Sequence, residues 1–264
     1  MNDFVSYYRF TELQCKNDVV KKIMGTFHFI HRGAWYDHDF GIHIPFVSSF
    51  RGIVKVEYFL SDGKHETFQY SLSDVRNNRI TIFQGTKRYL PIPGGGGEGF
   101  TNTRPQDSLV NPCSARFVVE FEVPVKRSDL GAMSMPYDPY LLVYTNGTSD
   151  GANWSYDLHL NGKNRFLDAP AGLPEEVGED SFLRIKDGMP YCFITNKSFK
   201  IVLERESIAE AYPKYTTWQP PFAPDKAEDI WMNDKKTYKL LKKKIMKPER
   251  NWTINIYKQL KASS

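Results

Sequence analysis

The sequence has few cysteines and no long apolar run, and these absences exclude several classes of protein. Its three cysteines, Cys15, Cys113 and Cys192, are scattered and odd in number, so they indicate neither a disulfide framework nor a zinc site. No run of about 18 apolar residues predicts a transmembrane helix. The first 30 residues show no short apolar core behind a basic start, so they do not predict a signal peptide. We therefore expect a fold built around a hydrophobic core.

Strong helix formers do not dominate any stretch before about residue 205, whereas aromatic residues are abundant. The chain holds 15 Tyr and 18 Phe, and hydrophobic residues make up 41% of it. Aromatic residues suit half-buried pleated surfaces. The 264 residues are an ordinary length for one large β domain.

Short strand-like segments recur along the chain, with turn signals between them. The clearest is "ARFVVEFEVPV" (115–125), in which apolar and polar residues alternate. "YLLVYTNG" (140–147) and "YDLHLNG" (156–162) both end in Asn-Gly, which is typical of hairpin turns. This pattern predicts an all-β fold, an antiparallel β-sandwich of jelly-roll-like type.

Three stretches depart from the strand pattern. Residues 91–112, which include "GGGGEG", and residues 167–181 have the composition of long mobile loops. A capping box at Ser207 and Glu210 predicts one short helix near 206–217. Residues 234–264 carry ten Lys or Arg and two acidic residues, so the chain ends in a strongly basic tail and the rest is acidic on balance.

The ordered motifs of the chain resemble the LruC domain family of bacterial envelope proteins. "NDFVSYYRFTE" is similar to the opening strand of that family, and "VVKKIMGTFHFIHRGAWYDHDFGIHIP" to its second and third strands. "DPYLLVYTNG", "YDLHLNG" and "SFKIVLERESIAEAYPKYTTW" resemble its later strands and closing helix. The resemblance covers roughly residues 2–231, and it implies an LruC-like domain over 1–231 with a lysine-rich extension over 232–264.

The resemblance also implies a calcium site at the start of the chain. In such families Asp-x-Asp-x-Asn-Asp precedes the opening strand, a spacing that can converge oxygens on Ca²⁺. Only Asn2 and Asp3 of that run are present here. We therefore expect Met1 to be a truncated or misassigned start, with the acidic half of the site and an export signal upstream. Asp37 and Asp39 are further candidates for oxygen ligands.

Other candidate sites are weaker. "HRGAWYDHDFGIH" holds His31, Asp37, His38, Asp39 and His43, a mixture that suits a transition metal, but a polar hairpin loop with the aspartates in its turn is the simpler interpretation. "HETFQ" (65–69) lacks the second His of a metalloprotease helix, and "GGGGEG" lacks the Lys of a phosphate loop. With no catalytic constellation, we expect a protein that is not an enzyme.

The expected function follows from the resemblance. It is a structural or adhesive protein of the cell envelope, or a secreted one, stabilised by calcium in its full-length form. The alternative is a carbohydrate-binding module that stacks glycans on loop aromatics, with Trp154 and Trp35 as the ligand-binding candidates. The basic tail could lie on an anionic membrane surface or be a solvated extension, and we expect no nucleic-acid partner.

Overall fold

The computed structural model describes residues 4–33, 37–47, 49–92, 100–104, 107–131, 137–144 and 155–160. These residues form nine strands: β1 (Val5–Cys15), β2 (Val19–His31), β3 (Asp37–His43), β4 (Gly52–Phe59), β5 (His65–Ser71), β6 (Arg79–Phe83), β7 (Cys113–Lys126), β8 (Asp138–Tyr144) and β9 (Ser155–His159). The helical elements are short: α1 (Thr86–Tyr89) and the 3-10 turns η1 (Leu72–Asp74), η2 (Arg76–Asn78) and η4 (Arg127–Leu130).

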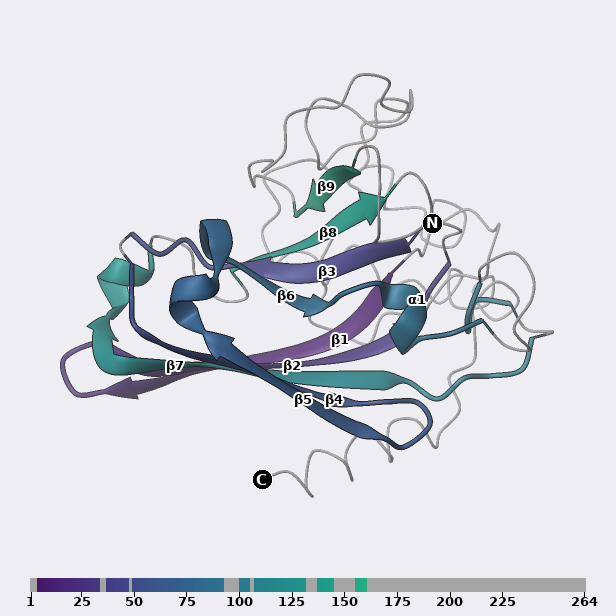
Figure 1. The fold of residues 1–264 in the computed structure, drawn as a ribbon, viewed down its shortest axis with the longest axis horizontal. Coiled ribbons are helices and arrows are strands. Elements are labelled where there is room, and N and C mark those ends of the chain that lie inside the picture. Colours follow the sequence, from purple (N-terminus) through teal and green to yellow (C-terminus); the bar gives the residue numbers. More distant parts are fainter. Residues whose placement is uncertain are drawn as a thin grey trace, which may run out of the picture.

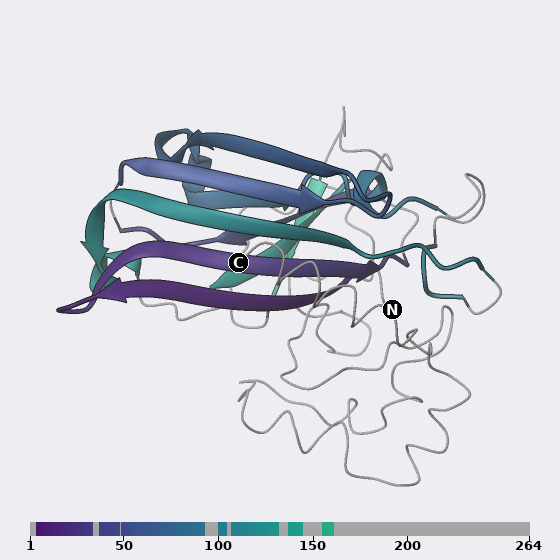
Figure 2. The same ribbon diagram turned by 90° about the horizontal axis from the view of Figure 1, so that it is seen from below.

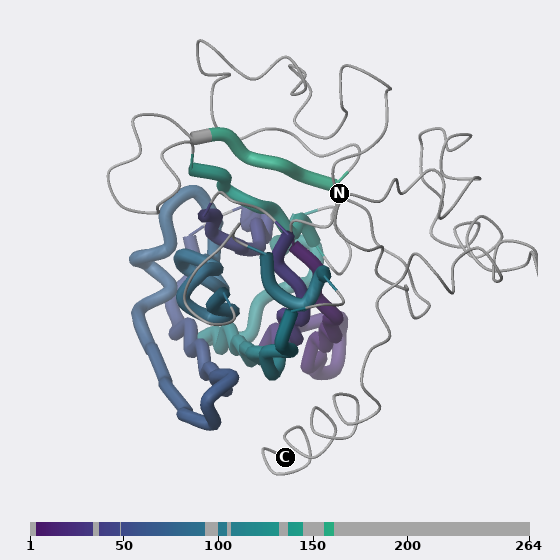
Figure 3. Tube along the Cα trace, turned by 90° about the vertical axis from the view of Figure 1, so that its right-hand side faces the viewer, coloured from purple at the N-terminus to yellow at the C-terminus, as the bar shows by residue number. Residues whose placement is uncertain are grey.

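The strands form two antiparallel sheets that face each other, as Figure 1 shows. The five-stranded sheet has the order β1-β2-β7-β4-β5, and Figure 2 shows its strands side by side. The four-stranded sheet has the order β6-β3-β8-β9, and Figure 3 shows the two green strands β8 and β9 side by side at the top of the view. The chain crosses repeatedly between the sheets, so that β3 pairs with β6 and β8 rather than with β2. The predicted antiparallel β-sandwich is thus confirmed.

Strand β7 shows why these residues form a sandwich. Its inward side chains are almost completely buried, and the residues between them are more exposed. The inward set is Cys113, Ala115, Phe117, Val119 and Phe121, each at most 2% exposed. A side-chain period of two matches the pleat, so one face joins the core and the other faces outward. The alternation read in the sequence was correct.

Aromatic rings fill the space between the two sheets. Phe27 of β2 meets Phe40 of β3 edge to face, with ring centroids 4.9 Å apart. Phe83 of β6 packs on Phe29 of β2 at 5.6 Å. Burying one such side chain contributes about 1.5–3 kcal/mol. These contacts set the distance between the four-stranded and the five-stranded sheet.

The first described residue, Phe4, is also part of this core. Its ring stacks on Phe29 and on Phe40, each with centroids 4.6 Å apart. The Phe4 ring therefore packs against both sheets.

The loop predicted over residues 91–112 differs in part from the expectation. Thr101, Asn102 and Thr103 are at most 1% exposed. Thr101 and Arg32 exchange backbone hydrogen bonds of 2.7 and 3.1 Å, and the Asn102 amide donates to the Ile30 carbonyl at 2.8 Å. The composition indicated mobility, but these hydrogen bonds hold residues 100–104 against the end of β2.

Other predictions fall on residues that the structure does not describe. They are the loop at 167–181, the helix near 206–217, the domain boundary at 231–232 and the basic tail over 232–264. Among the described residues, no helix is long and apolar enough to cross a membrane.

Candidate functional site

Several buried polar groups gather on one face of the four-stranded sheet. In β3, Phe40 and Ile42 point into the core, so the alternating Asp37, Asp39 and His43 point the other way. The strand register carries this face across the neighbouring strands, where His43 lies opposite Asp138, and Tyr140 opposite His159. We call this surface the polar face; its members are Asp37, Asp39, His43, Thr81, Asp138, Tyr140, Tyr144, Asp157 and His159.

The ionisable groups of the polar face are buried. His159 and Asp157 are 0% exposed and Asp138 is 1% exposed, while Asp37 and Asp39 are 7% and 8% exposed. Charged side chains are rarely buried to this degree unless they are paired, because desolvation penalises an isolated charge. The contacts within the face therefore decide its chemistry.

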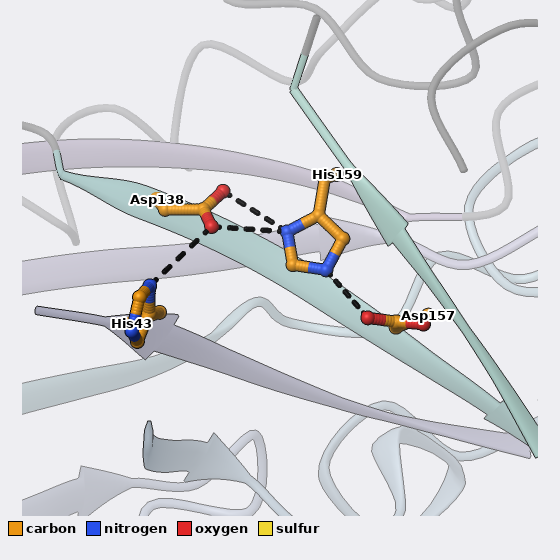
Figure 4. A network of polar contacts seen from close by, with 4 residues as sticks. All are labelled: His43, Asp138, Asp157 and His159. Atoms are coloured by element: carbon orange, nitrogen blue, oxygen red, sulfur yellow. Dashed lines mark hydrogen bonds and ion pairs between the residues drawn. The ribbon is translucent and has the colours of Figure 1, made fainter. Parts of the chain in front are cut away.

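His159 lies between two carboxylates, as Figure 4 shows. Its Nδ1 is 3.1 Å from both carboxylate oxygens of Asp138, and its Nε2 is 2.7 Å from Oδ2 of Asp157. Nδ1 of His43 approaches the same Asp138 carboxylate at 3.7 Å. The three strands β3, β8 and β9 thus meet at one buried ionic cluster, which we call the His159 cluster and which consists of His43, Asp138, Asp157 and His159.

The pKa values within this cluster move in opposite directions. Burial lowers the pKa of His159, but hydrogen bonds to Asp138 and Asp157, and the charges of both, outweigh it and raise that pKa above 6.5. Burial raises the pKa of Asp138, but contacts with His159 and His43 outweigh it and bring that pKa below 3.8. Both shifts favour an ion pair between Asp138 and His159.

Asp37 and Asp39 lie in strand β3, so the expectation that they occupy a turn was wrong. Their carboxylates bind the segment around α1 instead. Oδ1 of Asp37 accepts the backbone N–H of Lys87 at 3.1 Å, and Oδ1 of Asp39 accepts that of Gly85 at 2.7 Å. Oδ2 of Asp39 accepts the Tyr144 hydroxyl at 2.7 Å. Aspartate is tolerated here because its oxygens accept hydrogen bonds from N–H groups that would otherwise be buried without an acceptor.

The same contacts bear on the calcium prediction. Phe4, next to Asp3, packs against Phe40 on the core side of β3, whereas Asp37 and Asp39 point to the opposite side. A cation on these two aspartates would compete with their present hydrogen-bond donors. Among the residues that the structure describes, no group of three or more His, Cys, Asp or Glu could hold a metal ion. Asn2 and Asp3 lie outside the described residues, as do Trp35 and Trp154.

The histidines of the predicted mixed cluster are separated. His31 is in β2, as expected, and burial lowers its pKa to about 3. His38 points to the core side, where its Nδ1 hydrogen-bonds the Thr86 hydroxyl, while His43 turns to Asp138 on the polar face. The alternation of strand side chains thus sends neighbours in sequence to opposite sides.

Sequence reasoning missed the His159 cluster. Asp157 and His159 are two residues apart in "YDLHL", the spacing that puts two side chains on one face of a strand. Asp138 stands two residues before the strand-like segment predicted over 140–147. The spacing was a usable signal, but only the pairing of β8 with β9 shows that the three groups meet.

Comparisons with known proteins place the chain in a family without giving it an activity. In fold it is similar to the crystal structure of a "putative lipoprotein" from Bacteroides ovatus, with a TM-score of 0.50 and 13% sequence identity over 93% of this chain and 70% of that chain. No curated protein matches it. A family model described as a domain of unknown function, DUF4842, matches residues 17–222. The chain therefore belongs to the DUF4842 family of domains of unknown function.

Proposed function

We propose that this protein is a non-enzymatic, structural or adhesive component of the bacterial cell envelope, of the LruC type. The observation that carries the proposal is the use of the polar face. Its acids and His159 are buried and hydrogen-bond to one another or to backbone N–H groups. A general acid or base must reach its substrate, and these groups serve to join strands instead.

The envelope location rests on the LruC resemblance and is favoured by the name of the Bacteroides ovatus protein, a "putative lipoprotein". The test is fractionation of the bacterium that encodes the chain, with an antibody raised against the sandwich domain. We expect the protein in the envelope fraction. Recovery with a cytosolic marker enzyme would refute the proposal.

Calcium stabilisation is the second part of the proposal, with Asn2 and Asp3 as the ligands present in this chain. The test uses the chain extended upstream by its own reading frame. We expect Ca²⁺ to raise its Tm and a chelator to lower it, because an ion that binds only the folded state stabilises it. Mg²⁺ at equal concentration and an Asp3→Asn variant are the controls. An equal Tm with Ca²⁺ and with chelator would remove calcium from the proposal.

Glycan binding is the second candidate, and one described feature favours it. The outward face of the five-stranded sheet carries Tyr7, which is 40% exposed, and a stacked pair of Phe59 and His65 with centroids 4.8 Å apart. Aromatic rings of this kind can stack on sugars. Trp154→Ala is expected to weaken binding on a glycan array without lowering the Tm. Unchanged binding by this variant would exclude Trp154 as the principal contact.

A further inference from the structure

Both ring nitrogens of His159 face carboxylate oxygens, and this arrangement constrains the protonation state of the ring. An ionised carboxylate only accepts hydrogen bonds, and a neutral imidazole has one N–H to donate. A neutral ring would therefore turn a lone pair toward either Asp138 or Asp157, at 3.1 or 2.7 Å. A doubly protonated ring donates to both.

We propose that His159 is a buried imidazolium and that its second ring proton, which is lost as pH rises, holds strand β9 on the four-stranded sheet. The protonated ring joins β9 to β8 through its contact with Asp138, and Asp138 in turn contacts His43 of β3. This role goes beyond the proposed envelope function and does not depend on it.

The position of β9 makes it the element most sensitive to this proton. It has five residues, and among the described strands it stands at one end of the order β6-β3-β8-β9 and pairs with β8 alone. Two of its residues, Asp157 and His159, belong to the cluster. Loss of the proton would leave two buried carboxylates without the cation between them, which disfavours the closed strand.

Among the described residues, the charged and titratable groups in contact with His159 are Asp138 and the stacked ring of Tyr140 from β8 and Asp157 from β9 itself. Behind Asp138 lies His43 of β3, and Arg79 of β6 is paired opposite His43. Two of them are acids in direct contact with the ring. This balance is what favours the imidazolium.

The direction of the pH effect follows from the shift. The pKa of His159 is raised in the folded state, so its contribution is complete below the unfolded value of 6.5 and is lost as pH rises through the folded pKa. Between those two values the opening of β9 releases one proton, and the opening equilibrium rises up to about tenfold per pH unit. The proton thus holds the strand most strongly at pH 6.5 and below, and its contribution is lost above the folded pKa.

The protonation state is tested directly by nitrogen NMR of the full chain labelled at histidine. At pH 6.5 we expect both ring nitrogens of His159 to show the shift of a protonated nitrogen, each coupled to its own hydrogen. A single protonated ring nitrogen would overturn the proposal, because the ring would then be neutral with the proton on a carboxylate.

The role of this proton in holding β9 is tested by amide hydrogen exchange of β9, corrected for the intrinsic exchange rate at each pH. We expect protection of Leu158 and its neighbours to fall by up to about tenfold per pH unit above pH 6.5, with no such slope at Val56 in the five-stranded sheet. Asp157→Asn should shift the fall to lower pH, while Glu122→Gln, which removes an exposed carboxylate from β7, should not. Protection of β9 that does not change with pH, or that falls with the same slope in both sheets, would refute the role of this proton in holding β9.

Discussion

A methyl group added at Gly25 should destabilise the sandwich through a single aromatic ring. Gly25 lies opposite Phe10 of β1 and Phe117 of β7 in the register of the five-stranded sheet. A Cβ at this position would be 2.1 Å from Cε1 of Phe117 and 2.9 Å from its Cδ1. That is roughly 1.5 Å short of carbon–carbon contact, so the ring must move.

The ring of Phe117 has little room to move, and this sets the magnitude. It is 0% exposed and lies against Phe10 at 5.8 Å and Phe27 at 6.1 Å. Overpacking of this kind costs about 1–3 kcal/mol. The reduced freedom of the unfolded chain returns about 0.5 kcal/mol. We therefore expect Gly25→Ala to lower the free energy of unfolding by about 2 kcal/mol.

The assay is equilibrium unfolding in urea, followed by far-UV circular dichroism. Thr26→Ala, on the outward side of the same strand, is the matched control and should cost less. Phe117→Leu makes room, so the double variant should be more stable than the sum of the single changes predicts, with a coupling of about 1 kcal/mol or more. Substitutions at the surface seldom change the free energy of unfolding by more than about 0.5 kcal/mol. If Gly25→Ala changes it by no more than that, the ring of Phe117 does not exclude a side chain at this position.

Two further predictions concern buried hydrogen bonds. Asp39→Asn replaces a carboxylate that accepts from Gly85 and Tyr144; we expect a loss of about 1–2 kcal/mol in urea unfolding and faster amide exchange in α1, and equal exchange there would contradict the role of Asp39. Tyr137→Phe removes a hydroxyl that donates to Glu12, which Arg127 also contacts at 3.2 Å; we expect a loss of about 1.5–3 kcal/mol, and a Tm equal to wild type would contradict it.

The sandwich could be predicted because its signal is local. In "ARFVVEFEVPV" the apolar residues recur at every second position, and burial of one side of the strand requires only that period. The sharp turns between strands depend on a few neighbouring residues as well. Neither feature needs a distant partner, so both are visible without a structure.

The role of Asp37 and Asp39 could not be predicted in this way. Two aspartates beside a His are typical of a turn, and the turn interpretation follows local preference. The structure places them in a strand paired with β8, where their carboxylates accept the N–H groups of Gly85 and Lys87, more than 40 residues further along the chain. A long-range hydrogen bond therefore overrides the local preference.

The sequence by itself determined the fold class and the side-chain alternation of β7, since these follow from composition and from side-chain period. Only the tertiary structure decided that His43, Asp138, Asp157 and His159 form one buried cluster. The members come from three strands, and their meeting depends on which strands pair and in which register. Register is a property of the whole sheet, because a shift of one residue would send every side chain of a strand to the opposite face.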